Sequence, residues 1–135
     1  MSRIVLVCGS YHREAVERMA TTARNRAGEL GLEIAVERWL PGALECPLAL
    51  QQLLGRDDVD GAVLLGIIER GETQHGLVMG QAVIRAVLDL QIATGKPVGM
   101  GVIGPGANPQ HIEPRLLPYA RKAVEAVAEM MGQHR

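Results

Sequence analysis

Short apolar runs alternate with longer segments of helical periodicity along the chain. The first run, residues 4–8, is apolar throughout, as expected for a strand that is buried on both faces. Residues 13–30 place their apolar side chains on one stripe of a helix, and Gly31 ends it. The remaining pattern predicts strands at residues 33–39, 61–68 and 98–103 and helices ending near residue 54 and spanning about 119–131. This alternation predicts parallel βαβ units in one α/β domain over residues 1–135.

One further helical segment, residues 73–94, is apolar on nearly every side, and its only full charges are Arg85 and Asp89. Such a helix is typically buried on nearly every side, which a domain with about four helices cannot achieve unaided. We therefore expect a homo-oligomer in which a neighbouring copy covers this helix. A charged residue in place of Val83 or Val87 should then break assembly or folding. The alternative is a central helix between the sheet and the last helix.

The composition narrows the class of protein. Of the 135 residues, 47% are hydrophobic and 21% are charged, which indicates a globular chain rather than a disordered one. The net charge of -1 and the aromatic content of 2% argue against a nucleic-acid partner. No stretch free of charges approaches the roughly 20 apolar residues of a membrane helix, so we expect no membrane partner either.

The two cysteines, Cys8 and Cys46, lie far apart in the sequence and have no metal-binding spacing. We interpret them as buried thiols in a reducing compartment, with a structural disulfide as the alternative. Met-Ser-Arg followed by a short apolar strand does not have the layout of a signal peptide. We therefore expect a cytoplasmic location.

The segment 69–75, between the third strand and the apolar helix, carries the strongest functional signal. Ligands of open α/β sheets bind outside the carboxyl ends of the strands, where this segment lies. Gly71 permits a tight turn and Thr73 can cap the helix, so that free backbone N–H groups suit a phosphate. His75 would lie beside this anion as a proton carrier. The alternative is that Glu72 and Thr73 only cap the helix and that His75 is solvated.

Two more loops are expected at the same edge of the sheet. The segment 41–47 is bracketed by two prolines and offers backbone donors and the Glu45 carboxylate to a polar ligand. An ordinary turn, with Glu45 near a helix start, is the alternative. The segment 9–12 places the ring of Tyr11 at the same rim. Three loops therefore converge on one edge.

Two other motifs carry less weight. Gly-x-Gly-x-x-Gly at residues 99–104 matches the dinucleotide fingerprint literally, but its glycines lie inside a predicted strand and no second strand follows. We interpret these glycines as places where another backbone or a ligand comes close. Glu69, Glu72 and His75 straddle a turn, so we expect no metal site there.

Several segments together resemble the lumazine synthase family. Residues 67–75, Ile-Ile-Glu-Arg-Gly-Glu-Thr-Gln-His, are similar to its catalytic loop, and residues 39–47, Trp-Leu-Pro-Gly-Ala-Leu-Glu-Cys-Pro, to its ring-binding turn. Residues 102–106 and 119–126 resemble its archaeal-type branch. The resemblance implies a flavodoxin-like three-layer α/β/α fold with a four-stranded parallel sheet. It also implies pentamers, which in some members form larger shells.

The resemblance further implies a reaction without cofactor or metal: 5-amino-6-ribitylamino-uracil and 3,4-dihydroxy-2-butanone 4-phosphate condense to 6,7-dimethyl-8-ribityllumazine in riboflavin biosynthesis. His75 matches the proton-transfer histidine, and Met100 falls where a neighbouring subunit usually contributes an aromatic ring. The residues that match the pyrimidine and ribityl site are Tyr11, Ala43, Leu44, Glu45, Ile67, Ile68, Glu69 and Met100. Those that match the phosphate site are Gly71, Glu72, Thr73, Arg115 and Lys122.

The chain departs from the family at several positions. It has no phenylalanine, so three usual aromatic positions hold Tyr11, Leu44 and Met100, and Glu69 replaces an apolar residue beside the pyrimidine. Direct counting puts a proline at the phosphate-binding arginine, whereas a one-residue insertion brings Arg115 into register. Two other functions stay open: a riboflavin-synthase-like paralogue acting on a related pteridine or flavin precursor, and a catalytically silent oligomeric scaffold that binds flavin.

Overall fold

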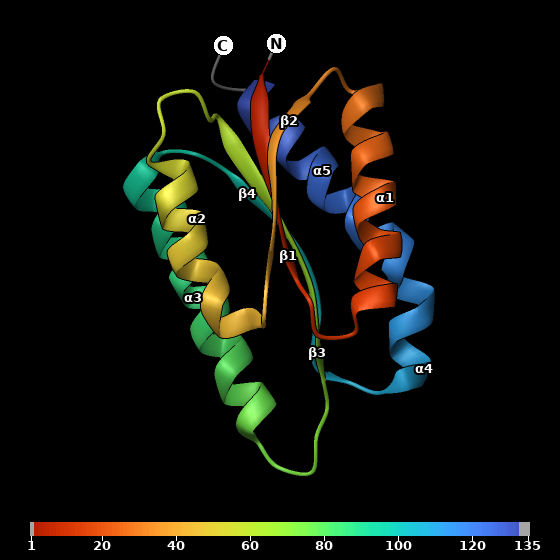
Figure 1. Cartoon of the computed structure of the whole chain (residues 1–135). Helices are drawn as coiled ribbons and strands as arrows, with labels where there is room; N and C mark the ends of the chain where they lie inside the picture. Colours follow the sequence, from red (N-terminus) through yellow and green to blue (C-terminus); the bar gives the residue numbers. More distant parts are fainter. Residues whose placement is uncertain (1, 133–135) are drawn as a thin grey trace.

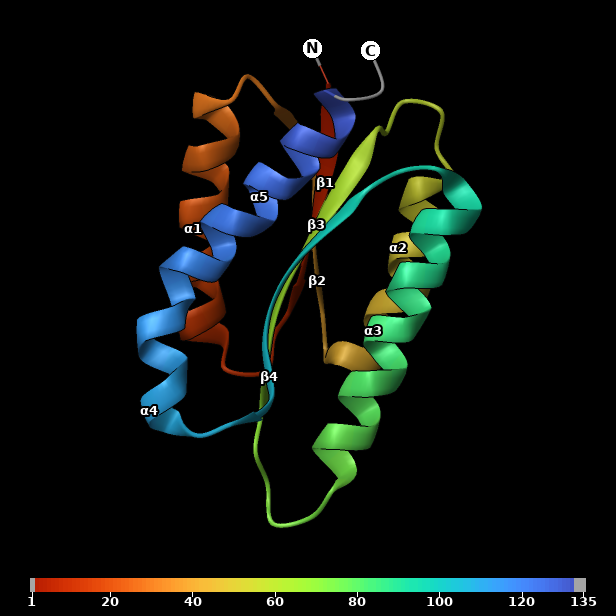
Figure 2. The same ribbon diagram turned by 180° about the vertical axis from the view of Figure 1, so that it is seen from behind.

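Four parallel strands form one sheet with helices on both faces in the computed structural model, which describes residues 2–132 (Figure 1). The strands, in the spatial order β2-β1-β3-β4, are β1 (Arg3–Gly9), β2 (Glu33–Leu40), β3 (Gly61–Glu69) and β4 (Val98–Ala107). One face is covered by α1 (Arg13–Glu29) and α5 (Leu116–Gly132), and the other by α2 (Cys46–Leu54) and α3 (His75–Thr94) (Figures 1 and 2). The strand order is that of flavodoxin-like folds, so the predicted three-layer architecture is confirmed.

The central strands lie between two apolar layers. In β1, Ile4 and Leu6 face α1 and α5, while Val5 and Val7 face α2 and α3, and none of the four is more than 1% exposed. Successive side chains of a strand point to opposite faces of the sheet, which is why a fully apolar run predicted a strand covered on both sides.

The glycines of β4 serve packing. A Cβ atom on Gly99 would lie 2.0 Å from the carbonyl oxygen of Ala123, and one on Gly101 would lie 3.1 Å from that of Tyr119. Both carbonyls belong to α5, so these glycines let the last helix lie directly on the edge strand. The interpretation of residues 99–104 as a site of close approach, rather than a dinucleotide fingerprint, is confirmed.

Strand β4 continues four residues beyond its predicted end. After a register shift Ala107 pairs with Glu69, and the Ala107 carbonyl accepts a hydrogen bond of 2.8 Å from the Arg70 N–H. Gly104 has φ +99, and a Cβ atom there would lie 2.1 Å from the Ile68 carbonyl oxygen. Residues 104–107 are therefore an irregular continuation of the edge strand beyond its predicted end.

The last helix also begins earlier than predicted. Helix α5 starts at Leu116, after the short turns α4 (Pro109–Ile112) and η2 (Glu113–Arg115). Pro114 and Pro118 each lie in the first turn of their element, where no intrahelical partner needs the missing N–H. The expected helix start near residue 119 was therefore wrong by three residues.

Helix α3 is buried along one stripe only. Val83 and Val87 are 4% and 0% exposed and belong to the core of this chain. Of the two expected effects of a charged residue at these positions, the structure therefore favours loss of folding over loss of an assembly contact. Val78 and Ile92, in contrast, are 61% and 82% exposed. Within one chain, the expected burial on nearly every side is therefore not found.

By length and composition alone, α3 is also apolar enough to cross a membrane, the one such helix within residues 2–132. Its two charged residues, Arg85 and Asp89, pair with each other at 3.3 Å. Its buried stripe packs on the sheet and on α2, as in a helix of a globular domain. The absence of a membrane partner stays a prediction.

Candidate active site

A cavity of about 340 Å³ opens at the carboxyl ends of β1 and β3. The loop after β1, the turn after β2 and the segment between β3 and α3 form its walls, as the sequence predicted. Strand order reverses between β1 and β3, the point at which flavodoxin-like folds bind their ligands. The lining residues are Tyr11, Pro41, Gly42, Ala43, Ile67, Ile68, Glu69, Gly71, Thr73, His75, Gly76 and Met79.

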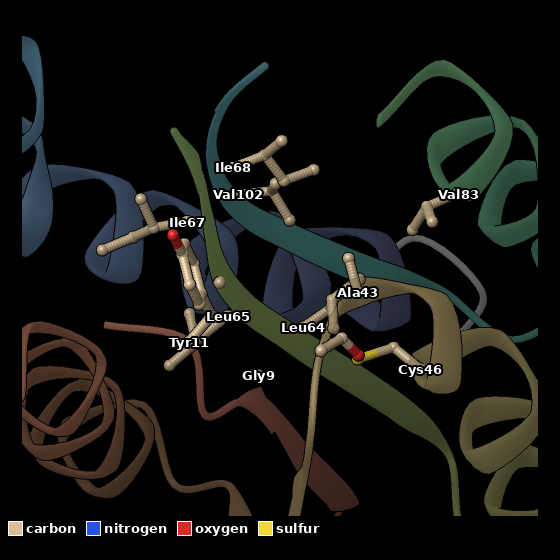
Figure 3. Close-up of a pocket in the computed structure, with 12 residues that line it drawn as sticks. Gly9, Tyr11, Ala43, Cys46, Leu64, Leu65, Ile67, Ile68, Val83 and Val102 are labelled. Carbon is tan, nitrogen blue, oxygen red and sulfur yellow. The ribbon is translucent and has the colours of Figure 1, made fainter. Parts of the chain in front are cut away.

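The floor of this cavity is apolar. Below it lies a second space of only about 30 Å³ between the sheet, α3 and the single turn η1 (Ala43–Glu45). Figure 3 shows Ile68, Val102 and Val83 on one side of this space and Cys46 on the other. A flat organic ring would therefore rest on aliphatic side chains, and polar recognition is left to the rim.

The two cysteines are free and buried, as predicted. Burial raises the pKa of Cys8 to about 12 and that of Cys46 to about 11. Both thiols are therefore protonated near neutral pH and are not nucleophiles. The Cys46 thiol instead donates a hydrogen bond of 3.4 Å to the Gly42 carbonyl, in the turn that lines the cavity.

His75 stands at the cavity wall as the first residue of α3. Its backbone N–H donates to the Thr73 hydroxyl at 3.2 Å, so the threonine provides the partner for one N–H group of the first helical turn. The helix itself starts two residues later than predicted. A Cβ atom on Gly76 would lie 3.3 Å from the Glu69 carbonyl oxygen, so this glycine lets α3 begin close to the end of β3. The positive end of a 20-residue helix thus meets the cavity beside an imidazole, an arrangement that suits an anion.

The site contains one interaction that the sequence did not reveal. His12 Nε2 lies 2.9 Å from Glu69 Oε2, and the two side chains are 31% and 29% exposed. The His12 ring also meets the Tyr11 ring edge to face, with 4.6 Å between centroids. The only signal in the sequence was that His12 follows Tyr11 in a loop already assigned to the rim.

Three predicted ring-site residues lie outside the cavity wall. Leu44, in η1, is 57% exposed, and Glu45 beside it is exposed too. Met100 is half-buried on β4 and packs on the core cluster between the sheet and α3. Of the predicted phosphate residues, Gly71 and Thr73 line the cavity, and Glu72 lines an adjoining groove.

The two predicted phosphate-binding cations lie elsewhere in the chain. Arg115 lines a groove on the α5 side of β4, where its Nη1 donates to the His111 carbonyl at 2.9 Å. Lys122 is exposed on α5, which covers the face of the sheet opposite to α3. Among residues 2–132, no lysine or arginine lines the main cavity. One chain therefore brings together the ring wall, the helix N-terminus and His75, but neither of the two predicted cations; Arg70 lines the adjoining groove with Glu72. Within residues 2–132, no cluster of three or more His, Cys, Asp or Glu side chains could hold a metal ion.

The fold and the cavity define a flavodoxin-like α/β protein with a small-molecule site at its strand ends. The chain belongs to the 6,7-dimethyl-8-ribityllumazine synthase family, whose profile matches residues 1–135. A protein of this name from Staphylothermus marinus is 42% identical over 133 residues, which cover 98% of this chain and 89% of that protein. Another, from Methanopyrus kandleri, is 38% identical over 133 residues, covering 98% and 94%.

A solved structure supports the fold alone. A 3-dehydroquinate dehydratase-like protein from Bifidobacterium longum superposes with a TM-score of 0.55 at 15% sequence identity. The match covers 98% of this chain and 99% of that one.

Proposed function

We propose that this protein condenses 5-amino-6-ribitylamino-uracil with 3,4-dihydroxy-2-butanone 4-phosphate in the cavity at the ends of β1 and β3. The product is 6,7-dimethyl-8-ribityllumazine, and phosphate and water leave. The protein is thus a transferase of riboflavin biosynthesis. Family membership over the whole chain favours this reaction over a riboflavin-synthase-like paralogue and over a silent scaffold. The observation that carries the proposal is that His75, Thr73 and Tyr11 share one cavity.

The cavity supplies what the condensation needs. The uracil ring lies against Tyr11 over the aliphatic floor, and the phosphate lies at the N-terminus of α3. An amine that adds to a ketone must release protons, and the carbonyl oxygen must gain them before it leaves as water. The imidazole of His75, at the cavity wall, exchanges these protons with the substrates. Most of the rate enhancement comes from holding the two substrates together.

The phosphate needs a full positive charge besides the partial charge of the helix. Because no lysine or arginine among residues 2–132 lines the cavity, Arg115 and Lys122 act from a second copy. Arginine is the better partner, since its forked donors match phosphate oxygens. Met100 completes the ring site from the same second copy.

The assembly is a homo-oligomer built on pentamers. Helices α2 and α3 lie side by side on one face of the sheet (Figure 1). Both helices expose large apolar side chains. Contiguous exposed apolar surface is typical of protein interfaces. The exposed residues are Leu48 on α2 and Leu77, Val78, Leu88 and Ile92 on α3.

Sedimentation tests the assembly. We expect the wild-type protein to sediment as an oligomer at micromolar concentration, and Ile92→Glu, which charges an 82% exposed side chain, to shift it to smaller species. A wild-type protein that sediments as a 14.5 kDa monomer would contradict the assembly. We place the enzyme in the cytoplasm, where two free buried thiols stay reduced.

Direct synthesis tests the reaction. The purified protein is mixed with both substrates, and lumazine fluorescence and free phosphate are followed together. We expect both to appear in equal amounts. Formation of riboflavin from the lumazine alone would favour the paralogue instead. Absence of product at any protein concentration would favour the silent scaffold.

A further inference from the structure

The paired side chains of His12 and Glu69 join two walls of the cavity. His12 lies in the loop after β1, and Glu69 is the last residue of β3. Their side chains meet at 2.9 Å and are only partly exposed. An ionised carboxylate only accepts hydrogen bonds, so His12 Nε2–H is the donor in this pair.

The backbone of His12 adopts a conformation that orients this pair. Its φ of 58 lies in the left-handed region, the only such value for a non-glycine residue within residues 2–132. Side chains with a Cβ atom rarely occupy this region. The His12 carbonyl accepts the Val16 N–H at 3.0 Å, so the first turn of α1 holds the residue in place. Unfavourable conformations of this kind persist where the surrounding structure fixes them, and they cluster at functional sites.

The pair leaves one acceptor available to a ligand. Oε2 of Glu69 is taken by His12, and no other side chain within the described part of the chain donates to Glu69. Glu69 lines the cavity together with Tyr11, whose ring packs on the imidazole of His12 at 75°. A flat ring lying against Tyr11 therefore has its edge within reach of the second carboxylate oxygen, Oε1.

We propose that Glu69 Oε1 accepts a hydrogen bond from a ring N–H of the uracil substrate and that His12 is the positioning residue that holds the carboxylate. This assignment rests on the proposed function, because it needs a uracil-type ring in the cavity. Among residues 2–132, Tyr11 is the only Phe, Tyr or Trp that lines the cavity, so a stacked ring needs a further contact to fix its orientation. A charge-assisted hydrogen bond to the ring edge adds both affinity and orientation.

Four variants test the assignment through the Michaelis constants of the two substrates. Glu69→Leu removes the acceptor and should raise KM for the uracil substrate about ten- to a hundredfold, because a hydrogen bond to a charged group contributes that much. Glu69→Gln keeps an acceptor oxygen and should raise it less than about fivefold. His12→Ala should raise KM for the uracil substrate about three- to tenfold. Because the two residues act as one unit, the double variant of His12→Ala and Glu69→Leu should have a KM no higher than that of Glu69→Leu alone. The KM for the butanone phosphate should not change.

Direct binding separates this assignment from the reaction itself. The probe is 5,6-diaminouracil, which has the ring but no ribityl chain. In titration calorimetry, Glu69→Leu should lose as much affinity for this probe as for the full substrate. If only the full substrate binds more weakly, Glu69 contacts the ribityl chain and the ring assignment is wrong. If wild-type and Glu69→Leu bind the ring equally, the proposal is overturned even in an active enzyme. If the ring binds through Glu69 but no lumazine forms, the recognition stands and the proposed reaction fails.

A matched control removes a carboxylate that pairs elsewhere. Glu29, at the far end of α1, pairs with Arg26 at 3.2 Å and does not line the cavity. Glu29→Gln should leave both Michaelis constants unchanged. Should Glu69→Leu fail to fold by circular dichroism, His12→Ala carries the test, since it frees the carboxylate without burying a new group. An unchanged KM for the uracil substrate in His12→Ala would then overturn the positioning role.

Discussion

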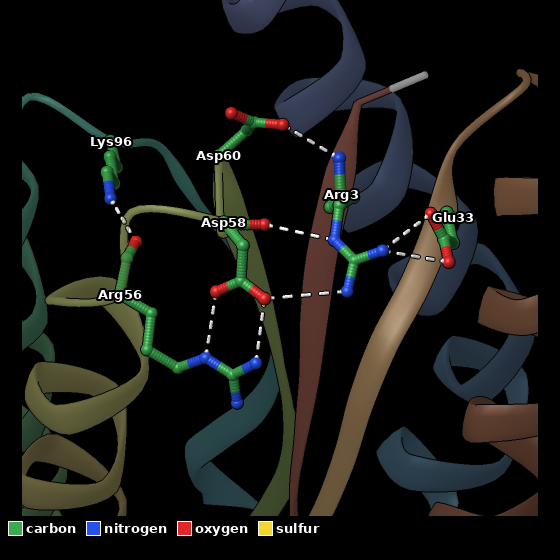
Figure 4. Close-up of polar contacts among 6 residues, drawn as sticks. All are labelled: Arg3, Glu33, Arg56, Asp58, Asp60 and Lys96. Carbon is green, nitrogen blue, oxygen red and sulfur yellow. Dashed lines mark hydrogen bonds and ion pairs between the residues drawn. The ribbon is translucent and has the colours of Figure 1, made fainter.

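At the amino end of the sheet, charged side chains bind one another, whereas at the carboxyl end they face a cavity. Arg3, at the start of β1, donates to both carboxylate oxygens of Glu33 at 3.0 and 3.1 Å and to the Asp58 carbonyl at 3.1 Å (Figure 4). Asp58 also holds Arg56 through two hydrogen bonds of 2.9 and 2.8 Å. Lys96 donates to the carbonyl of Arg56 at 2.8 Å. This network ties β1 and β2 to the loops before β3 and β4.

The carboxyl end has no comparable network. Within residues 2–132, the hydrogen-bonded His12–Glu69 pair is the one side-chain pair at the cavity, and the side chains of Glu72 and His75 have no partner. Polar groups that are satisfied by protein partners contribute to stability, while those left unpaired in a concave site are available to a ligand. Substitutions at the two ends should therefore separate stability from activity.

The largest effect is expected for His75→Ala. Loss of a general acid–base group should lower kcat about ten- to a thousandfold, while the substrates still bind. The melting temperature should stay within about 2 °C, because the exposed imidazole makes no side-chain contact that stabilises the fold. Rapid-mixing fluorescence measures kcat, and calorimetry measures melting. Wild-type turnover across the pH range would show that His75 is only a first-turn residue.

Arg115→Ala should have the next largest effect. Its charge-assisted hydrogen bonds to phosphate should contribute roughly 1.5–3 kcal/mol, so KM for the butanone phosphate should rise about ten- to a hundredfold. The KM for the uracil substrate should barely change. Lys122→Ala is the matched comparison, since both cations lie on the α5 side of the sheet. If Lys122→Ala raises the phosphate KM and Arg115→Ala does not, the register of the phosphate residues is wrong.

Arg3→Ala should instead affect stability alone. It removes contacts to Glu33 and Asp58, whose side chains are nearly half-exposed, and the free energy of unfolding should fall by about 0.5–1 kcal/mol. Arg18 offers a control, since it makes one exposed ion pair with Glu113 and its loss should cost less than about 0.5 kcal/mol. Urea titration measures both. A loss of kcat in Arg3→Ala at unchanged stability would break the division between the two ends.

The sequence predicted most of the fold because the strands are buried on both faces. An apolar run such as residues 4–8 has one stable arrangement in a chain of this length, and the structure has it. The errors fall at the ends of two elements. Gly104 bulges within β4, which continues four residues beyond its predicted end, and Pro118 lies in the first turn of α5, which begins three residues before its predicted start.

The site was predicted in part. Strand ends locate a cavity in any open α/β sheet, which is why Tyr11, Ile67 and His75 were found together. The His12–Glu69 pair spans 57 positions and depends on the left-handed backbone of His12, and periodicity encodes neither of these. In the assembly that we propose, a second copy sets the position of Arg115 relative to the phosphate, and a single sequence holds no geometric information about that copy.

The smallest effect is expected for the pH dependence of the amino-end network. The hydrogen bonds from Arg56 hold the pKa of Asp58 below its usual range. A carboxyl group whose pKa is lower in the folded than in the unfolded protein stabilises the fold above the unfolded pKa, and this contribution is lost as pH falls through the folded value. The melting temperature of Asp58→Asn should therefore lie slightly below that of the wild-type protein from about pH 5 to 7. This difference in melting temperature should disappear below about pH 4.

Asp57, the neighbouring residue, provides the control for this last substitution. It makes no hydrogen bond or ion pair in the part of the chain that the structure describes, so Asp57→Asn should change melting at no pH. Salt should narrow the gap between wild-type and Asp58→Asn, because the side chains of the Arg56–Asp58 pair are 44% and 45% exposed and exposed charges are screened. A gap that persists unchanged at pH 3 and in 1 M salt would mean that Asp58 contributes through its shape and not through its charge. The amino end would then be held by packing, and the contrast between the two ends of the sheet would not be electrostatic.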